Sequence, residues 1–315
     1  MKTRDTKETL FYLCVWLAML AQPRAARSEF NYVTNSGKIT IIKYTGPGGA
    51  VAIPETIDGL PVIAVADKAF FSTAKLTSVA IPESVTSVGN SVFANCRLLI
   101  EVTLPNSITH IGSGAFSNCV SLTTMKLPNR LTSVEPYTFY RCASLSSITI
   151  PGNIVNVGSF AFASAAGLTN VTLVGGVASI EDHAFEGTRL LSAIIPNSVT
   201  NIGTFAFSSC LSLNNASISG SVARIGNQAF DHCTSLKEIV VAASNPAYCS
   251  VAGVLFSKSQ TALIQFPGGK AGEYTIPEAV TNIGRFAFNY CTNLTRVSIG
   301  NSVSEIGEAA FAFEA

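Results

Sequence analysis

Phenylalanine recurs along this chain at an almost constant interval. The steps are 23 residues, except for one of 22 and one of 58, in the series Phe70, Phe93, Phe116, Phe139, Phe162, Phe185, Phe207, Phe230, Phe288 and Phe311. A fixed period of about 20 to 50 residues indicates a solenoid, in which each repeat buries its apolar face against its neighbours. The pattern therefore predicts one elongated repeat unit and directs the search for function to a surface.

Each repeat contains the same sequence of local signals. In Leu122–Phe139, the alternation of Met125 and Leu127 with polar residues predicts a short strand with one face inward. Pro128 then turns the chain, and Val134 belongs to a second short apolar segment. A tight bend, where most repeats place glycine, leads to one helical or 3₁₀ turn that carries the phenylalanine. Stacking such coils would align equivalent strands in parallel, about 4.8 Å apart. The expected fold class is a mainly β repeat solenoid with coils of about 23 residues.

The repeat resembles a known family. Residues Leu99–Cys119 read LIEVTLPNSITHIGSGAFSNC. This follows the pattern L-x-x-[VI]-x-[IL]-P-x-S-[VI]-T-x-[VI]-G-x-x-A-F-x-x-C, which closely resembles the BspA-like leucine-rich repeat family. The pattern extends over roughly residues 60–313 in tandem copies. The resemblance implies an exported or surface-displayed solenoid that engages other macromolecules, with adhesins among its members. It does not imply a particular ligand.

Residues 1–28 are predicted to be a signal peptide. Basic residues, among them Lys2 and Arg4, precede the apolar run Leu10–Ala21, which is too short to span a bilayer. Small residues allow cleavage after Ser28, so the mature chain would begin at Glu29. Acidic residues in the first segment are less typical of a signal. The alternatives are an uncleaved anchor and a misassigned start codon.

Residues 29–59 are expected to form an N-terminal β-hairpin cap. Ile39–Ile42 and Val51–Ile53 read as strands on either side of the turn cluster Gly46–Gly49. A cap of this kind would shield the open end of the first coil. The leucine-rich repeat solenoid then occupies residues 60–315, in about ten coils.

The step of 58 residues contains an insertion at about residues 246–272. Gly253–Lys258 and Thr261–Phe266 flank Ser259 and Gln260, which predicts a β-hairpin. We interpret the insertion as an elongated structural coil; the alternative is that it shapes a binding surface. The chain ends at Ala315, before any further strand or cap. We therefore expect either a fragment of a longer protein or an end that associates with another molecule.

Composition narrows the possible partners. Apolar residues make up 48% of the chain and charged residues 12%, and the 20 basic and 19 acidic residues leave a net charge of +1. This balance lacks the basic field that nucleic acid or an anionic membrane would require. No second apolar stretch approaches the length of a transmembrane helix, so we expect no membrane insertion beyond the signal segment.

Six cysteines share one position of the repeat, three residues after a phenylalanine: Cys96, Cys119, Cys142, Cys210, Cys233 and Cys291. Other repeats place Thr73, Ala165 or Thr188 at the same position. A disulfide framework would not alternate with alanine and threonine, so we expect a column of small buried hydrophobic residues. Intervals of 23 residues also lack the spacing of a metal site. No metal or cofactor is expected.

We also expect no catalytic site. His110, His183 and His232 lie in different repeats, at positions where other repeats carry ordinary polar residues. Nothing in the sequence places a serine or cysteine nucleophile near them, so they are interpreted as solvated surface residues. The carboxylates are scattered, and the glycine-rich segments match no phosphate-binding motif.

The exposed strand positions form a candidate ligand face that is neutral and rich in hydroxyl and amide groups. Such a face would bind a protein or glycan through many weak hydrogen bonds. The alternative is that threonine and serine simply favour exposed strand positions. The candidate residues are Thr77, Thr103, Thr123, Thr124, Lys126, Ser147, Thr149, Asn170, Thr172, Asn215, Lys237 and Arg296.

The sequence therefore predicts an exported, non-catalytic leucine-rich repeat protein, secreted or at the cell surface. It would bind an extracellular protein or glycan in the manner of an adhesin. The first alternative is a structural component of a surface assembly that associates end to end. An enzyme is the least favoured reading.

Overall fold

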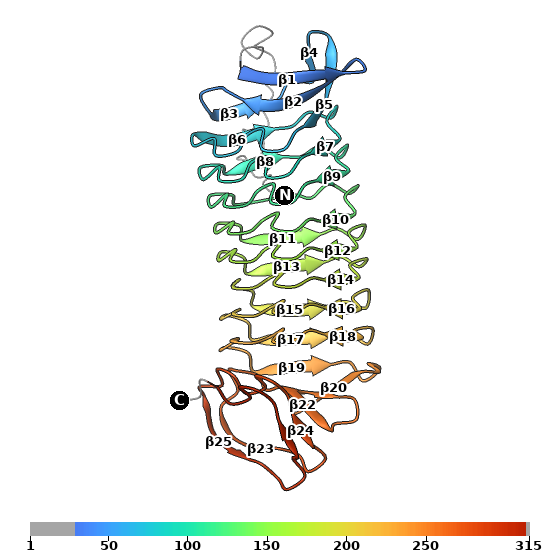
Figure 1. Ribbon diagram of the computed structural model, residues 1–315, viewed down its shortest axis with the longest axis vertical. Coiled ribbons are helices and arrows are strands. Elements are labelled where there is room, and N and C mark those ends of the chain that lie inside the picture. The colour runs from blue at the N-terminus through green and yellow to red at the C-terminus, as the bar shows by residue number, and fades with distance from the viewer. Residues whose placement is uncertain (1–28, 313–315) are drawn as a thin grey trace, which may run out of the picture.

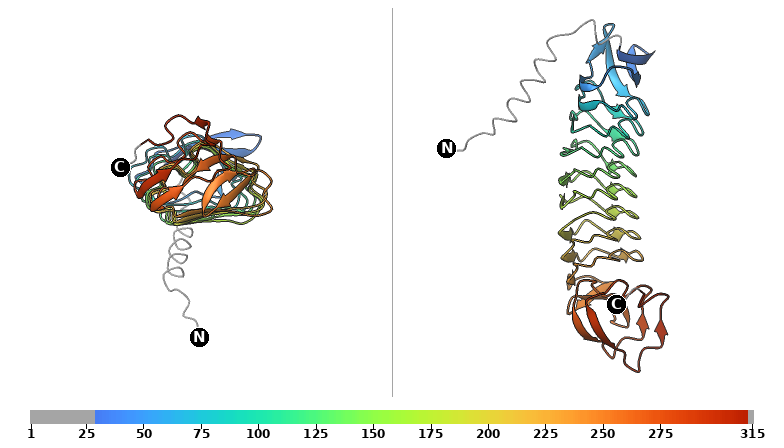
Figure 2. Two further views of the ribbon diagram at one scale, coloured as in Figure 1. Left: turned by 90° about the horizontal axis from the view of Figure 1, so that it is seen from below. Right: turned by 90° about the vertical axis from the view of Figure 1, so that its left-hand side faces the viewer.

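The computed structural model describes residues 29–312, which form an elongated β-solenoid (Figure 1). Successive coils stack along the long axis of the molecule, and Figure 2 shows the flattened cross-section. This architecture confirms the predicted fold class. The predicted signal peptide, residues 1–28, lies outside the described residues, as do residues 313–315.

The longer strands of successive coils form one column. They pair in parallel within three sheets, in the orders β3-β6-β8, β11-β13 and β15-β17-β19. The strands are β3 (Gly49–Ala52), β6 (Leu76–Ala80), β8 (Glu101–Thr103), β11 (Ser147–Ile150), β13 (Asn170–Leu173), β15 (Ser192–Ile195), β17 (Asn215–Ile218) and β19 (Glu238–Val241). The coil between β8 and β11 has no assigned strand at residues 122–127. We call the outward surface of the column from β6 to β19, including residues 123–127, the strand face.

Shorter strands form a second column. They also pair in parallel, β7 with β9 and then β10 through β18 in order. Each has two residues: β7 (Ser87–Val88), β9 (His110–Ile111), β10 (Ser133–Val134), β12 (Asn156–Val157), β14 (Ser179–Ile180), β16 (Asn201–Ile202) and β18 (Arg224–Ile225). Two strands per coil thus enclose the core between them (Figure 1).

An antiparallel hairpin covers the first coil. It consists of β1 (Phe30–Asn35) and β2 (Lys38–Tyr44), whose tight turn has positive φ at both Ser36 (47°) and Gly37 (73°). This is not the predicted hairpin, and the prediction that Ile39–Ile42 and Val51–Ile53 form one around Gly46–Gly49 is wrong. β2 and β3 do not pair with each other; they pair in parallel with β5 (Leu60–Val65) and β6, and β4 (Thr56–Ile57) folds back on β5. β2 and β3 are already part of the first coil.

Phenylalanine rings stack through the core as a ladder. Phe116 and Phe139 lie 5.5 Å apart between ring centroids with planes 5° apart, and Phe185 and Phe207 lie 5.3 Å apart across the 22-residue step. On the N-terminal side, Tyr44 continues the ladder beyond Phe70, with ring centroids 4.9 Å apart. Each buried ring removes about 150–250 Å² of largely apolar surface from water, which stabilises the stack.

The turn that carries each phenylalanine differs from the predicted helical or 3₁₀ turn. Residues two positions before and after the ring have positive φ, as at Phe160 (58°) and Ser164 (58°) around Phe162. Left-handed residues interrupt a right-handed helix, so the chain makes isolated i→i−3 hydrogen bonds instead. Within residues 30–312 every assigned element is a strand. The described chain accordingly has no helix capable of crossing a membrane.

The cysteine column has a role beyond filling space. Each buried thiol donates to the carbonyl oxygen of a phenylalanine in the preceding coil, as Cys119 does to Phe93 at 3.1 Å and Cys142 to Phe116 at 3.2 Å. Thr188, at the same position, donates to Phe185 at 2.9 Å. A small residue with a donor therefore suits this position. The cysteines of residues 29–312 are free.

The insertion divides the solenoid into two cores. The predicted hairpin is confirmed: β21 (Val254–Ser257) and β22 (Ala262–Gln265) are antiparallel, and β20 (Tyr248–Val251) joins them. Two more columns follow: β24 (Asn282–Ile283) and β26 (Glu305–Ile306) continue from β22, and β23 (Gly272–Thr275) pairs with β25 (Leu294–Ser298).

A second aromatic ladder begins at Phe266, which the periodicity did not identify. Its ring stacks on Phe288 at 5.1 Å, and Phe288 stacks on Phe311 at 4.9 Å. The first hydrophobic core extends to Leu255, whereas Val254 and Phe266 belong to the second. We call the junction between the coil of Phe230 and the coils that follow it the break.

Candidate ligand-binding face

Strand register places the predicted ligand residues in rows across the strand face. Between β11 and β13, Ser147 lies opposite Asn170 and Thr149 lies opposite Thr172. Alternate residues of a strand point to the same side, so each of these pairs faces outward while Ile148 points into the core. Parallel coils therefore convert a sequence repeat into aligned rows of hydroxyl and amide groups.

Most of the predicted residues lie together on this face or at its edge. Thr77 is half-buried, and the remaining ones are exposed: Thr103, Thr123, Thr124, Lys126, Ser147, Thr149, Asn170, Thr172, Asn215 and Lys237. Thr123, Thr124 and Lys126 lie on the coil without an assigned strand. Thr123 also bonds its neighbour coil, since its hydroxyl donates to the carbonyl of Ile100 at 3.3 Å.

Arg296 is not part of this group. It lies on β25, in the separate two-stranded sheet beyond the break, where it is opposite Glu273. The prediction that placed Arg296 on the common face is therefore wrong. The physical reason is that the insertion interrupts the column, so the repeat position alone no longer determines which sheet a residue joins (Figure 1).

Exposed apolar residues on the same face were missed by the sequence reading. Ile194 is 69% exposed on β15 and lies opposite Ser217, which in turn lies opposite Val240. Leu191 directly precedes β15 and Val174 directly follows β13, and they are 52% and 50% exposed. Ile194 occupies the outward position that Thr149 and Thr172 occupy in other repeats, and this substitution was the available signal. We call Val174, Leu191, Ile194 and Val240 the apolar patch.

The charges of the strand face balance. Glu101 and Glu238 lie among Lys126 and Lys237, and none of these forms an ion pair within the described chain. Burial raises the pKa of the Glu101 carboxyl. A nearly neutral surface with hydroxyls, amides and a central group of apolar side chains can bury area against a partner, but it offers no reactive group.

The histidines have more contacts than expected. His183 stacks between Phe160 and Phe205, with centroids 4.3 and 4.9 Å away, and its Nδ1 lies 2.9 Å from Glu186. His232 stacks on Tyr290 at 3.8 Å. Both are half-buried, so the description of solvated surface residues holds only for His110.

One histidine also lies near a serine, contrary to expectation. Ser209 Oγ is 3.4 Å from His232 Nδ1, because the 23-residue period stacks the two positions. The neighbouring carboxylate of Asp231 contacts Asn289 and Gln228. The pair thus lacks the carboxylate that would orient a catalytic imidazole. Among residues 29–312, no three histidine, cysteine or acidic side chains group to hold a metal ion.

Comparison with known proteins agrees with the repeat pattern. The model of the BspA type leucine rich repeat region matches residues 63–189, 155–270 and 265–314, in six copies. A leucine rich cell surface protein from Faecalibacterium prausnitzii is 30% identical with a TM-score of 0.71, over 93% of this chain and 74% of the other. The leucine rich repeat protein of T. pallidum is 34% identical with a TM-score of 0.57, over 61% of this chain and 91% of the other. No curated protein matches significantly. The chain belongs to the BspA-type leucine-rich repeat family.

Proposed function

We propose that this protein is an exported, non-catalytic surface protein that binds a protein ligand through the strand face. The observation that carries the proposal is the apolar patch, with Ile194 69% exposed within aligned rows of threonine, serine and asparagine. Exposed apolar side chains rimmed by polar residues are typical of protein interaction sites. An adhesin-like role at the cell surface follows from this kind of binding.

A protein ligand accounts for the apolar patch better than a glycan does. Burying a fully exposed isoleucine or valine side chain stabilises a complex by about 1.5–3 kcal/mol. A hydroxyl-rich glycan offers little apolar area against which Ile194 and Val240 could be buried. The surrounding hydroxyls and amides would then supply orientation through hydrogen bonds at the rim.

Export is supported by the first segment of the chain and by similarity. A basic start and an apolar run of signal length precede Glu29. The similar protein from Faecalibacterium prausnitzii is described as a cell surface protein. We therefore place the mature chain outside the cytoplasm, secreted or at the surface.

The test is binding of the full-length mature chain to an array of extracellular-matrix proteins and, in parallel, to a glycan array. Saturable binding to one or more proteins supports the proposal. Binding to glycans alone would replace the protein ligand with a carbohydrate, and binding to neither array, with an intact circular dichroism spectrum, would argue against an adhesin-like role.

End-to-end association is the remaining alternative, in which the protein is an assembly component. In the last of the coils that the structure describes, Ile306 on β26 is 53% exposed. Light scattering of the full-length chain over a concentration series distinguishes the two. A monomer at all concentrations excludes assembly, whereas mass that grows with concentration supports it.

A further inference from the structure

The break leaves backbone donors of the solenoid without partners. From Phe70 to Phe207, each ladder phenylalanine donates its N–H to a carbonyl in the next coil, as Phe207 does to Ala229 at 2.8 Å. Phe230 is the last ring before the break, and its N–H has no acceptor among the residues that the structure describes. Phe288, in the second ladder, again donates to Ala310 at 2.8 Å.

Two neighbouring backbone groups are left open in the same way. The Gln228 N–H has no acceptor within residues 29–312, although the equivalent Phe205 N–H donates to Asn227 at 3.1 Å. The Ile225 carbonyl likewise accepts no hydrogen bond within this range, although the equivalent Ile202 carbonyl accepts from Gly226 at 2.7 Å. One acceptor and two donors therefore remain on the exposed edge of this coil. Such open backbone edges are templates for pairing with another chain.

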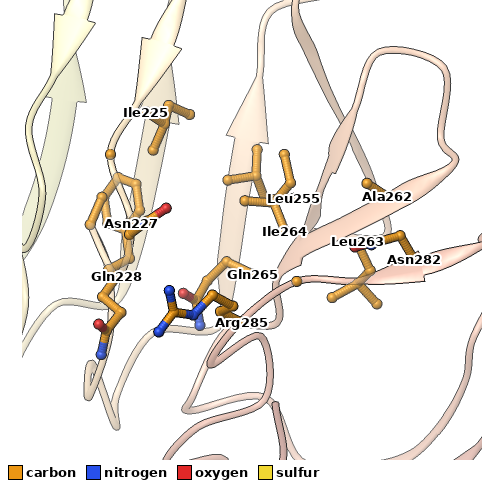
Figure 3. Close-up of a pocket in the computed structure, with 14 residues that line it drawn as sticks. Ile225, Asn227, Gln228, Leu255, Ala262, Leu263, Ile264, Gln265, Asn282 and Arg285 are labelled. Carbon is orange, nitrogen blue, oxygen red and sulfur yellow. The ribbon is translucent and has the colours of Figure 1, made fainter. Parts of the chain in front are cut away.

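A cavity lies directly over this edge. It has a volume of about 190 Å³ and is lined on one side by the continuous segment Ile225–Phe230 (Figure 3). The other side comes from the second part of the solenoid, including Leu255, Gln265 and Arg285. The cavity is smaller than the pockets of about 300–1,000 Å³ that hold drug-sized ligands. It can therefore cover only main-chain atoms of a bound segment, whose longer side chains would extend into solvent.

A buried amide faces this cavity. Gln265 is 6% exposed and lies at the centre of the lining in Figure 3. Its Nε2 donates to the carbonyls of Phe266 and Ala287, which holds the amide beside the cavity. The Arg285 guanidinium already pairs with Glu308 at 2.5 Å, so the cavity has no free cation to select an anion.

We propose that the break binds a four-residue extended peptide segment of a protein ligand, by main-chain pairing. The first peptide N–H donates to Ile225, and the second and fourth carbonyls accept from Gln228 and Phe230. Gly226–Ala229 makes these same three bonds on the preceding coil. Because glycine and alanine occupy the first and fourth positions there, the peptide needs small residues at both. The proposal rests on the proposed function, since it defines a second contact with a protein ligand.

The probe is the blocked peptide acetyl-Gly-Asn-Gln-Ala-amide, which copies Gly226–Ala229. It is titrated into the deuterated, ¹⁵N-labelled mature chain and followed by amide NMR. We expect millimolar binding, because a few net hydrogen bonds contribute little affinity. The amide protons of Gln228 and Phe230 should shift downfield and exchange more slowly with solvent, whereas Phe207 should not change. No change at these two amides would overturn the proposal.

Two controls make the assignment specific. Replacing the first glycine of the probe by sarcosine removes the N–H that pairs with Ile225 and should weaken binding about tenfold or more. In the protein, Asn227→Trp should fill the cavity and abolish the shifts. Thr204→Trp, at the equivalent position of the preceding coil, should leave them unchanged. Equal binding of the sarcosine probe, equal effects of the two tryptophans, or the same shifts with N-acetylglucosamine would each contradict peptide pairing.

An Ile194→Asp variant separates this proposal from the proposed function. It lies on the strand face, away from the cavity lining, and should leave the probe titration unchanged. If Ile194→Asp retains probe binding but no longer binds the protein identified on the array, the result supports both the strand face and the break as binding sites. If the array shows no ligand but the probe still binds, only the proposed function fails.

Discussion

Asn289 donates a hydrogen bond to Asp231 at 2.8 Å and thereby joins coils that are 58 residues apart in sequence. The stacked rings of His232 and Tyr290, 3.8 Å apart, lie beside this bond. The two parts of the solenoid are thus in contact at Asp231, while the edge at Ile225–Phe230 is open to the cavity. The insertion therefore leaves the two parts of the solenoid in contact at Asp231 and separated by the cavity at Ile225–Phe230.

The Asp231 bond predicts a dependence of stability on pH. Burial raises the pKa of the Asp231 carboxyl, and the bond from Asn289 offsets only part of this effect. The folded chain then binds the proton more tightly than the unfolded chain does. The contribution is fully present below the pKa of the unfolded chain, and it is lost as pH rises through the higher pKa of the folded chain.

Asp231→Asn should remove this dependence and keep the bond, since an amide oxygen also accepts from Asn289. Urea unfolding from about pH 4 to 7 measures it. The wild type should lose stability relative to Asp231→Asn as pH rises. Glu83→Gln, at an exposed position, serves as the control. Parallel stability profiles for the wild type and Asp231→Asn would contradict the account.

The two aromatic ladders predict two regions of separate stability. Phe266→Ala should destabilise the second core by about 3–5 kcal/mol, because it removes a fully buried ring and leaves a cavity. Repeat coils interact with their nearest neighbours, so the loss should remain local. Hydrogen exchange should accelerate at Phe288 and Ile283 and stay slow at Phe116. Phe139→Ala is the matched variant and should give the reverse pattern; uniform acceleration in both would mean one cooperative core.

Thiol reactivity tests the cysteine column. Burial raises the pKa of Cys96 to about 11, and it also raises the pKa of Cys119 and Cys142. Burial raises the pKa of Cys249 as well, but this thiol is half-buried whereas the column thiols are buried, so at pH 8 a disulfide reagent should label Cys249 first in the folded chain. Cys249→Ser should abolish this fast phase. Fast labelling of several cysteines would show that the reagent reaches the cysteine column in the folded chain.

Export can be tested by fluorescence, because Trp16 is the only tryptophan and lies in the predicted signal peptide. Secreted protein cleaved after Ser28 should show tyrosine emission alone, and mass spectrometry should identify Glu29 as its first residue. A tryptophan spectrum from material collected outside the cell would rule out cleavage at this site.

Features that repeat could be predicted from the sequence, and features that occur once could not. The constant spacing of residues such as Phe116 and Phe139 determined the ladder, the parallel strands and most of the ligand face. The second ladder was hidden because Phe266 follows the insertion and breaks the spacing. At the start of the insertion, the buried Asn245 side chain donates to the carbonyls of Ser219 and Val222 on the preceding coil. A contact that occurs once produces no periodic signal in the sequence.

The apolar patch likewise could not be predicted from the repeat pattern. Thr149, Thr172 and Ser217 occupy the outward strand position in their coils, whereas Ile194 and Val240 depart from this polar pattern. The 69% exposure of Ile194 is evident only in the structure, where strand register places this residue opposite Ser217 on the next coil. The departure from the repeat, and not the repeat itself, directs attention to this part of the face.

The most direct test of the strand face compares two matched variants in binding to the protein found on the array. Ile194→Asp places a charge in the apolar patch, and Val155→Asp places one at a 45% exposed valine beside β12, in the other column. Binding through the strand face predicts that Ile194→Asp weakens affinity about tenfold or more, or about 1.4 kcal/mol, while Val155→Asp has no effect. Equal affinities for both variants and the wild type would contradict it.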